Sequence, residues 1–275
     1  MSGPRSFAAV LLALAGLAAP AHAQGAIAAR VAAAPKSGAV AMHFPAREGV
    51  CGDGRTFITL GRMTMAEGGM YTDARGWKGS PCLPGPVRVV LTLHEGRVEN
   101  VATTVGGATA PAGATDLGEV DPADAARYLL DLAARGEGRA ADRAVLPAVL
   151  ADRAVVWPSL LAIARDSARS RHHPARNSAA FWLSRFAAAA RNGHPGELAA
   201  AEPEGDEEGD GESDVRGKAI FALSQLHDHE GVPPLIEVAR DHRDPRARAQ
   251  AMFWLGQSGD RRAYEFFEQV LKGGR

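Results

Sequence analysis

The chain has 275 residues, of which 31 are basic and 32 acidic, so its formal net charge is −1. This balance, with a pI near 6.8, excludes the strongly basic surface that non-specific binding of nucleic acid or of an anionic membrane requires. With 46% hydrophobic and 23% charged residues, the chain is predicted to be globular and long enough for one large domain or two small ones.

The first 23 residues have the pattern of a secretory signal peptide. Arg5 precedes an apolar run over residues 7–19, and the segment that ends at Ala23 has small residues at positions −3 and −1 of a cleavage site. This run is shorter than the roughly 20 residues that a membrane helix needs. We therefore expect cleavage after Ala23 and export of residues 24–275 to the periplasm or the extracellular space, without a membrane span.

Residues 37–107 are predicted to form a small antiparallel β domain. Apolar residues alternate with other residues over 39–44 and 87–93, and 55–60 is a further candidate strand. A tight turn at Glu95-Gly96 predicts a hairpin between 87–93 and 97–105. The stretch 108–120 is interpreted as a linker.

Cys51 and Cys82, the two cysteines of the chain, lie in this domain. In an oxidising compartment an isolated pair favours a disulfide, and its spacing is unlike that of a C-x-x-C redox motif. We expect a structural disulfide worth about 3–4 kcal/mol. Trp77, in a loop between the cysteines, is a candidate recognition residue, and the alternative is that it holds the loop against the sheet.

From Asp121 to residue 272 the pattern is helical. Asp121-Pro122 and Asp244-Pro245 each predict a helix start, with an N-cap followed by proline at the first position. The motif Arg-x-x-Ala-apolar-Phe-x-Leu begins at Arg176, Arg216 and Arg248. The last two copies are 32 residues apart. A repeat of this length, with two helices per unit, predicts an α-solenoid of three to four helix pairs.

The repeated residues have predicted structural roles. The alanines at 179, 219 and 251 would allow close approach of helices, while Phe and Leu of the motif, and Trp182 and Trp254, would fill the core. Arg176, Arg216 and Arg248 would form a ladder by pairing with acidic residues of adjacent units, and ligand binding is the alternative role.

The Asp-Pro-x-x-Arg sequence at 244–248 and the Gly-Asp-x-x-Ala sequence at 259–263 resemble HEAT repeats, as found in bacterial proteins and in phycobilin lyases. The resemblance covers about residues 140–272. It implies stacked antiparallel helix pairs and a scaffolding or protein-binding role, and it carries no catalytic motif and no cofactor. The expected fold class is thus α+β, a small β domain followed by an all-α HEAT-like solenoid.

Residues 202–214 interrupt the repeats with eight carboxylates and no basic residue. We interpret them as an expanded, self-repelling loop. A calcium loop is the alternative, although the ligand spacing of an EF-hand is absent.

His227 and His229 are the densest group of potential metal ligands, but they lie in a predicted turn and lack a known ligand spacing. The sequence favours an exported, non-catalytic protein that binds a protein partner. The alternatives are an enzyme with a metal-assisted site between the domains and a calcium-binding structural protein.

Overall fold

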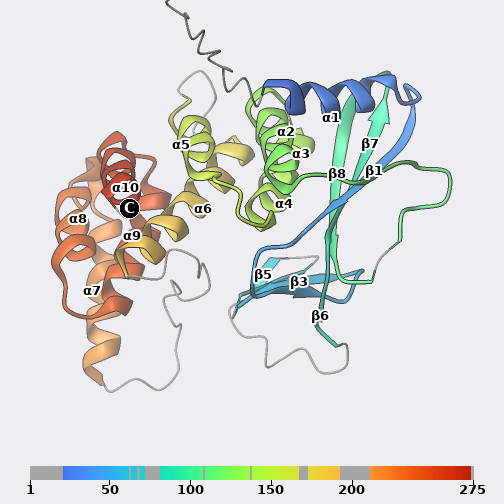
Figure 1. Ribbon diagram of the computed structural model, residues 1–275. Helices are drawn as coiled ribbons and strands as arrows, with labels where there is room; N and C mark the ends of the chain where they lie inside the picture. Colours follow the sequence, from blue (N-terminus) through green and yellow to red (C-terminus); the bar gives the residue numbers. More distant parts are fainter. Residues whose placement is uncertain are drawn as a thin grey trace, which may run out of the picture.

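The computed structural model describes residues 21–61, 63–66, 69–71, 81–107, 109–136, 138–166, 173–192 and 211–273. Within these residues, two β-sheets are followed by a helical part, which confirms the predicted α+β class (Figure 1). No helix among them is long and apolar enough to cross a bilayer.

The first sheet has four strands in the order β8-β7-β1-β9. Its strands are β1 (Gly38–Phe44), β7 (Val87–His94), β8 (Arg97–Val105) and β9 (Thr115–Glu119). The hairpin between β7 and β8 turns at Glu95 and Gly96, which both have positive φ, and the alternation in β7 buries one face, as predicted.

The prediction of a linker over 108–120 was wrong, because strand β9 lies inside it. Strands β1, β7 and β8, which lie within the predicted domain 37–107, pair antiparallel as expected, whereas β9 pairs parallel with β1. The sequence of β9 is short and polar, with Leu117 as its buried residue, so it has little intrinsic strand propensity and depends on pairing with the edge of β1.

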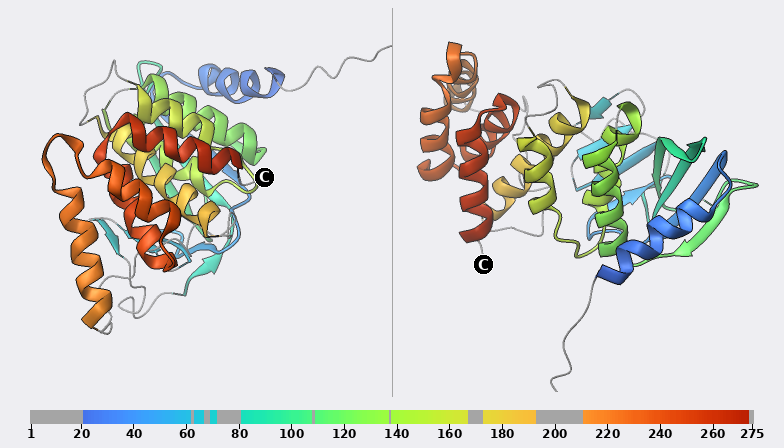
Figure 2. Two further views of the ribbon diagram at one scale, coloured as in Figure 1. Left: turned by 90° about the vertical axis from the view of Figure 1, so that its left-hand side faces the viewer. Right: turned by 90° about the horizontal axis from the view of Figure 1, so that it is seen from above.

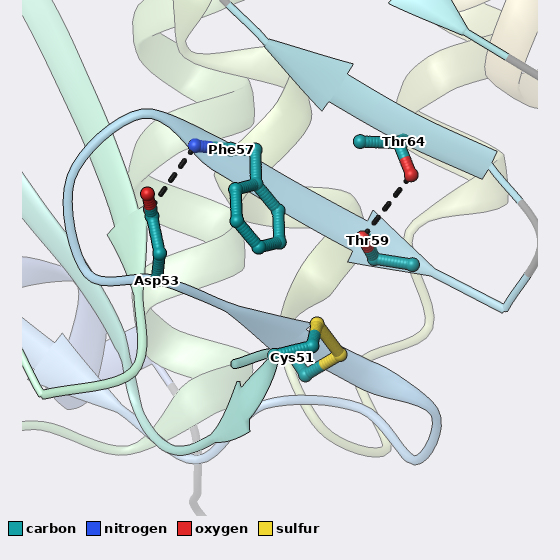
Figure 3. The surroundings of a disulfide bond; sticks show 6 residues. Cys51, Asp53, Phe57, Thr59 and Thr64 are labelled. Atoms are coloured by element: carbon teal, nitrogen blue, oxygen red, sulfur yellow. Dashed lines mark hydrogen bonds between the residues drawn. A yellow bond between two sulfur atoms is a disulfide. The ribbon is translucent and has the colours of Figure 1, made fainter. Parts of the chain in front are cut away.

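The second sheet is small and antiparallel, with the order β5-β4-β3-β2-β6. Its strands are β2 (Val50–Gly52), β3 (Phe57–Leu60), β4 (Met63–Ala66), β5 (Gly69–Tyr71) and β6 (Leu83–Pro84). Cys51 of β2 is bonded to Cys82 beside β6, which confirms the disulfide, and Thr59 and Thr64 contact each other across the neighbouring strands (Figure 3). The disulfide thus links β2 to the residue that precedes β6, the strand with which β2 pairs.

Helices cover the first sheet and continue from it without a break in the core. They are α1 (Ala21–Ala33), α2 (Pro122–Arg135), α3 (Gly138–Arg143) and α4 (Val145–Leu150). The Asp121 side chain caps α2 by accepting from the N–H of Asp124 at 3.0 Å, as predicted. One hydrophobic cluster runs from α1 and the sheet through these helices to the end of the chain.

The remaining helices are α5 (Trp157–Arg165), α6 (Pro174–Arg191), α7 (Gly211–Ser224), α8 (Val232–Asp241), α9 (Pro245–Ser258) and α10 (Arg261–Gly273). Asp244 caps α9 through the N–H of Arg246, again as predicted. Residues 211–214, placed in the acidic loop by the sequence, belong to α7, while 202–210 and Trp77 lie outside the described residues.

The order of these helices in space differs from their order in the chain. Helices α9 and α10 pack against α6, and α7 packs against α8 and α9, so the last helix pair lies between α6 and α7 (Figure 2). Asn192 at the end of α6 contacts the start of α9, whereas Arg216 near the start of α7 is paired with the α9 N-cap. Helix α9 therefore runs antiparallel to α6 and parallel to α7.

Candidate functional site

The outermost layer of the helical part exposes apolar side chains. Phe221 of α7 and Leu226 just after it are each 46% exposed. Ala219 is exposed too, which corrects the expected role of this repeat position: Ala179 and Ala251 are fully buried, but α7 turns this face away from its neighbours. Because α7 lies at the outer end of the stack, no further described layer covers this face (Figure 1).

A row of aromatic rings links this face to the interior. The Phe181 ring in α6 lies 6.3 Å from the ring of Phe253 in α9, and Trp254 lies 5.2 Å from Phe221. Trp182 is 3% exposed and Trp254 is partly buried, so both contribute to the core. Phe221 is the exposed end of a row that is otherwise anchored in the fold.

A hollow of about 350 Å³ lies beside the exposed face, between α7, α8 and α9. Leu223, Leu226 and Trp254 supply its apolar walls, and His229 lies at its rim. The hollow makes the outer face concave next to Phe221, a shape that can hold a side chain of a partner.

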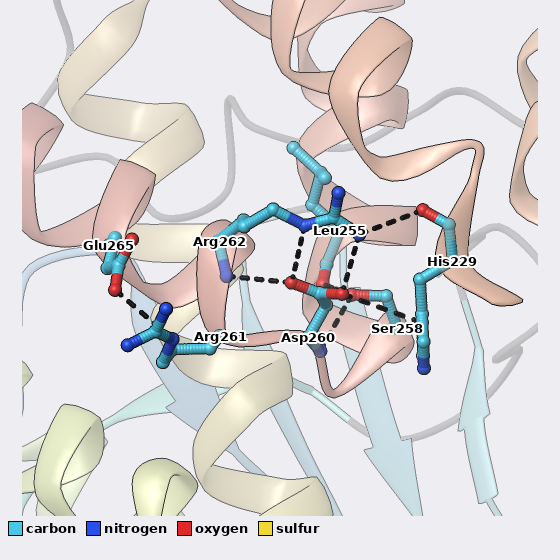
Figure 4. A network of polar contacts seen from close by, with 7 residues as sticks. All are labelled: His229, Leu255, Ser258, Asp260, Arg261, Arg262 and Glu265. Carbon is cyan, nitrogen blue, oxygen red and sulfur yellow. Dashed lines mark hydrogen bonds and ion pairs between the residues drawn. The ribbon is translucent and has the colours of Figure 1, made fainter.

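His227 and His229, the weak candidates for metal ligands, lie in a short 3-10 turn, η3 (His227–His229), between α7 and α8. Asp228 and His229 both have positive φ, an uncommon conformation for residues other than glycine. Arg262 donates to the main-chain oxygen of His229 at 3.1 Å and to Asp260 at 2.9 Å, so the turn is bonded to the α9–α10 turn (Figure 4). These contacts give the turn a role in joining the two repeats.

The electrostatics of this turn are set by Asp260. The side-chain hydrogen bond from Arg262 is the main reason that the pKa of Asp260 lies below its ordinary value; its partial burial acts in the opposite direction. The His229 ring lies 4.0 Å from the same carboxylate. In the described part of the chain, no three His, Cys, Asp or Glu side chains gather as a metal site would require.

The three repeated arginines hold helix ends. Arg216 forms an ion pair with Asp244, the N-cap of α9, at 2.8 Å. Arg176 donates to the carbonyl of Ala164 at the end of α5. Arg248 donates to the main-chain oxygen of His242 at 2.7 Å and to the side chain of Asn192, at the ends of α8 and α6. Arg216 thus contacts a carboxylate of another unit, as the predicted ladder requires, whereas the oxygens described here for Arg176 and Arg248 are uncharged, so the ladder as a whole stays a prediction.

A larger cleft of about 590 Å³ lies between the small sheet, β8 and helices α3, α4 and α6. Asp142 of α3 lines this cleft and also a neighbouring hollow over α6. Burial raises the pKa of Asp142, and the nearby charges of Arg143 and His173 offset part of that effect. The cleft therefore combines apolar walls with a carboxyl group whose charge is disfavoured.

Sequence reasoning did not identify Phe221, Leu226 or Asp142 as site residues. The repeat motif marks Phe221 as an aromatic position, but it does not show that α7 lies at the end of the stack, because α9 and α10 follow α7 in the chain. No signal existed for Asp142, since the cleft is formed by segments that are far apart in the chain.

Residues 208–274 match the family model of HEAT repeats, a range that contains α7 to α10. This part of the chain is thus composed of HEAT repeats, as the sequence predicted, although the match is shorter than the expected range 140–272. No curated protein and no solved structure matches the chain.

Proposed function

We propose that the protein is exported and acts as a non-catalytic scaffold, whose protein partner contacts the outer face of α7. HEAT repeats are typical of protein binding, which supports the class of function. The observation that carries the proposal is the exposure of Phe221 and Leu226 on the outermost helical layer. The end units of solenoids usually present a polar outer face, and exposed apolar clusters mark interaction sites.

The disulfide supports export, since disulfides persist in oxidising compartments. The predicted cleavage after Ala23 would fall within α1, after its third residue. Ile27 and Val31 of α1 are buried and follow this position, so these packed residues would remain. N-terminal sequencing of the exported protein tests this step, and a first residue beyond Ile27 would contradict it.

The binding surface is tested by site-specific photo-cross-linking in the producing cell. A photoreactive amino acid at position 221 is expected to cross-link one discrete partner. The matched control is position 155, because Val155 is 77% exposed and belongs to the segment before α5 rather than to α7. Equal cross-linking at both positions, or none at 221, would contradict the proposal. A cross-link between two copies of the chain would show that this face mediates self-association, which would also contradict a separate partner.

The two alternative functions are tested by calorimetric titration of the exported form with zinc and with calcium. Zinc binding that is lost in His229→Ala would favour a metal-assisted site, for which His227 and His229 are the candidates. Calcium binding would favour the acidic stretch 202–214 as its ligand, which stays a prediction.

A further inference from the structure

The cleft between the sheets and the helices contains a free sheet edge. The order of the first sheet ends at β8, and Val101 to Thr104 of this strand line the cleft. Helix α3 packs against β8, and Arg143 of this helix donates to the side chain of Asn100 at 2.8 Å, next to the stretch that lines the cleft. Within this stretch Val101 is only 2% exposed, whereas Ala102 is exposed and Thr103 and Thr104 are partly exposed, so the edge is accessible from Ala102 to Thr104.

One hydrogen bond shows which way the main-chain N–H and C=O groups of this stretch point. The carbonyl of Val105 accepts from the N–H of Gly54 at 2.8 Å, so the polar groups of Val105 point away from β7. Pairing between β7 and β8 is regular from Val101 to Val105. Because orientation alternates along a strand, the N–H and C=O groups of Thr103 and Val101 also point away from β7, toward the cleft. An edge of this kind accepts a further strand.

The walls beside the edge suit an extended chain that carries both apolar and acidic side chains. Phe57, Met65 and Leu146 supply apolar surface. Arg55 is exposed at the end of β3, in a loop that Asp53 holds by accepting from the N–H groups of Arg55 and Thr56 at 2.9 and 2.8 Å. A cation on such a fixed loop is placed to pair with a carboxylate of a ligand.

The cleft is also long enough for several residues of a peptide. The neighbouring hollow of about 480 Å³ shares Asp142, Ser178 and Trp182 with it, so the two form a groove from β3 across α6 to Gln257 of α9. An extended chain advances by about 3.3 Å per residue and fits such a groove better than a compact ligand does.

We propose that this groove binds an extended peptide of a partner protein, which pairs with the free edge of β8 at Thr103 and places an acidic side chain beside Arg55. The site is separate from the outer face of α7. It therefore goes beyond the proposed function and can fail independently of it.

The test starts with a random peptide library, displayed on phage and selected against the full exported chain with its disulfide formed. Enriched peptides are expected to carry an acidic residue near β-branched or apolar residues. They are then synthesised with a fluorescent label, and their affinity is measured by anisotropy. N-methylation of alternate peptide groups is expected to weaken binding by about tenfold or more, because it removes the donors that pair with β8.

Protein variants locate the site. Thr103→Pro removes one N–H of the free edge and is expected to weaken binding about tenfold, whereas Thr103→Val retains that N–H and the affinity. Arg55→Gln is expected to weaken binding about threefold or more, while Arg97→Gln, an exposed arginine of β8 outside the cleft, does not. Phe221→Ser should leave peptide affinity unchanged, which separates this site from the α7 face.

The proposal is overturned if selection enriches no peptide, or if N-methylated peptides bind as tightly as their parents. Equal binding to wild type and Thr103→Pro would also overturn it. If Thr103→Pro does not fold, judged by its circular dichroism, the N-methylated peptides decide the question on the wild-type protein.

Discussion

The guanidinium carbon of Arg47 lies 5.6 Å from the centroid of the Phe186 ring, and this contact fastens the β region to helix α6. The same side chain donates to the carbonyls of Val149 and Ala154 at 3.2 and 3.1 Å. Burial lowers the pKa of Arg47, and the carboxylate of Asp152 partly compensates. One cation thus joins the segment after β1 to three separate parts of the helical region.

Replacement of Arg47 by alanine is expected to lower the free energy of unfolding by about 2–3 kcal/mol, because two buried carbonyls lose their donors and the ring loses its cation. Denaturant unfolding measures the change. Arg153→Ala is the control, since that side chain is 92% exposed, and it should change stability by less than about 0.5 kcal/mol. Similar losses in both variants would show that Arg47 does not fasten the two regions.

The disulfide gives a second prediction. Closing a loop between residues 31 positions apart should stabilise the fold by about 3–4 kcal/mol. The double variant Cys51→Ser, Cys82→Ser is therefore expected to unfold at a lower denaturant concentration than the oxidised wild type. Reduced wild type should unfold like the variant. An unchanged midpoint in both cases would contradict a structural role for the bond.

Two helical glycines give a matched pair of substitutions with opposite signs. A Cβ at Gly256 in α9 would lie 2.7 Å from the Cβ of Ser184 in α6, so Gly256→Ala forces the two helices apart at a cost of about 1–3 kcal/mol. A Cβ at Gly217 in α7 would meet the mobile end of Gln250 at 3.4 Å, so Gly217→Ala should stabilise by about 0.5–1 kcal/mol through helix propensity. Thermal unfolding of the two variants distinguishes these signs, and a stabilising Gly256→Ala would show that α6 and α9 are less closely packed.

Asp142 predicts a dependence of stability on pH. Because its pKa is raised by burial, the folded chain binds this proton more tightly than the unfolded chain, and stability falls as the pH rises above the ordinary value of 3.8. Asp142→Asn is therefore expected to be more stable than wild type at neutral pH, with the difference vanishing below about pH 4.

Denaturant unfolding of both proteins across this range measures the Asp142 effect. Glu99→Gln, which replaces an exposed carboxyl of β8, is the control for the loss of one carboxylate. A stability difference that stays constant with pH would show that ionisation of Asp142 is not its source.

Features that depend on local pattern could be predicted from the sequence. The alternation in β7 and the caps Asp121 and Asp244 rest on preferences that act over a few residues. The disulfide was predicted from the oxidising compartment that an exported protein enters. Strand β9 was missed because its residues have weak strand propensity and its pairing with β1 is non-local.

The candidate sites depend on tertiary arrangement and were less accessible. The repeat motif is present in α6, α7 and α9, but nothing in it distinguishes a helix surrounded by neighbours from one at the end of the stack. Eleven residues of α6 are buried, whereas the face of α7 around Phe221 is exposed. The groove likewise requires β3, β8, α3 and α6 to be in place together.

The position of α9 and α10 between α6 and α7 has a consequence for how the chain acquires its structure. A ribosome makes α7 and α8 first, at a time when the surface on which they will dock has not been synthesised. The helical part therefore cannot assemble one unit after another from its N-terminal end. A chain that lacks α9 and α10 would leave both α6 and α7 without their shared partner, so the synthesis of this last helix pair is the step that closes the helical part.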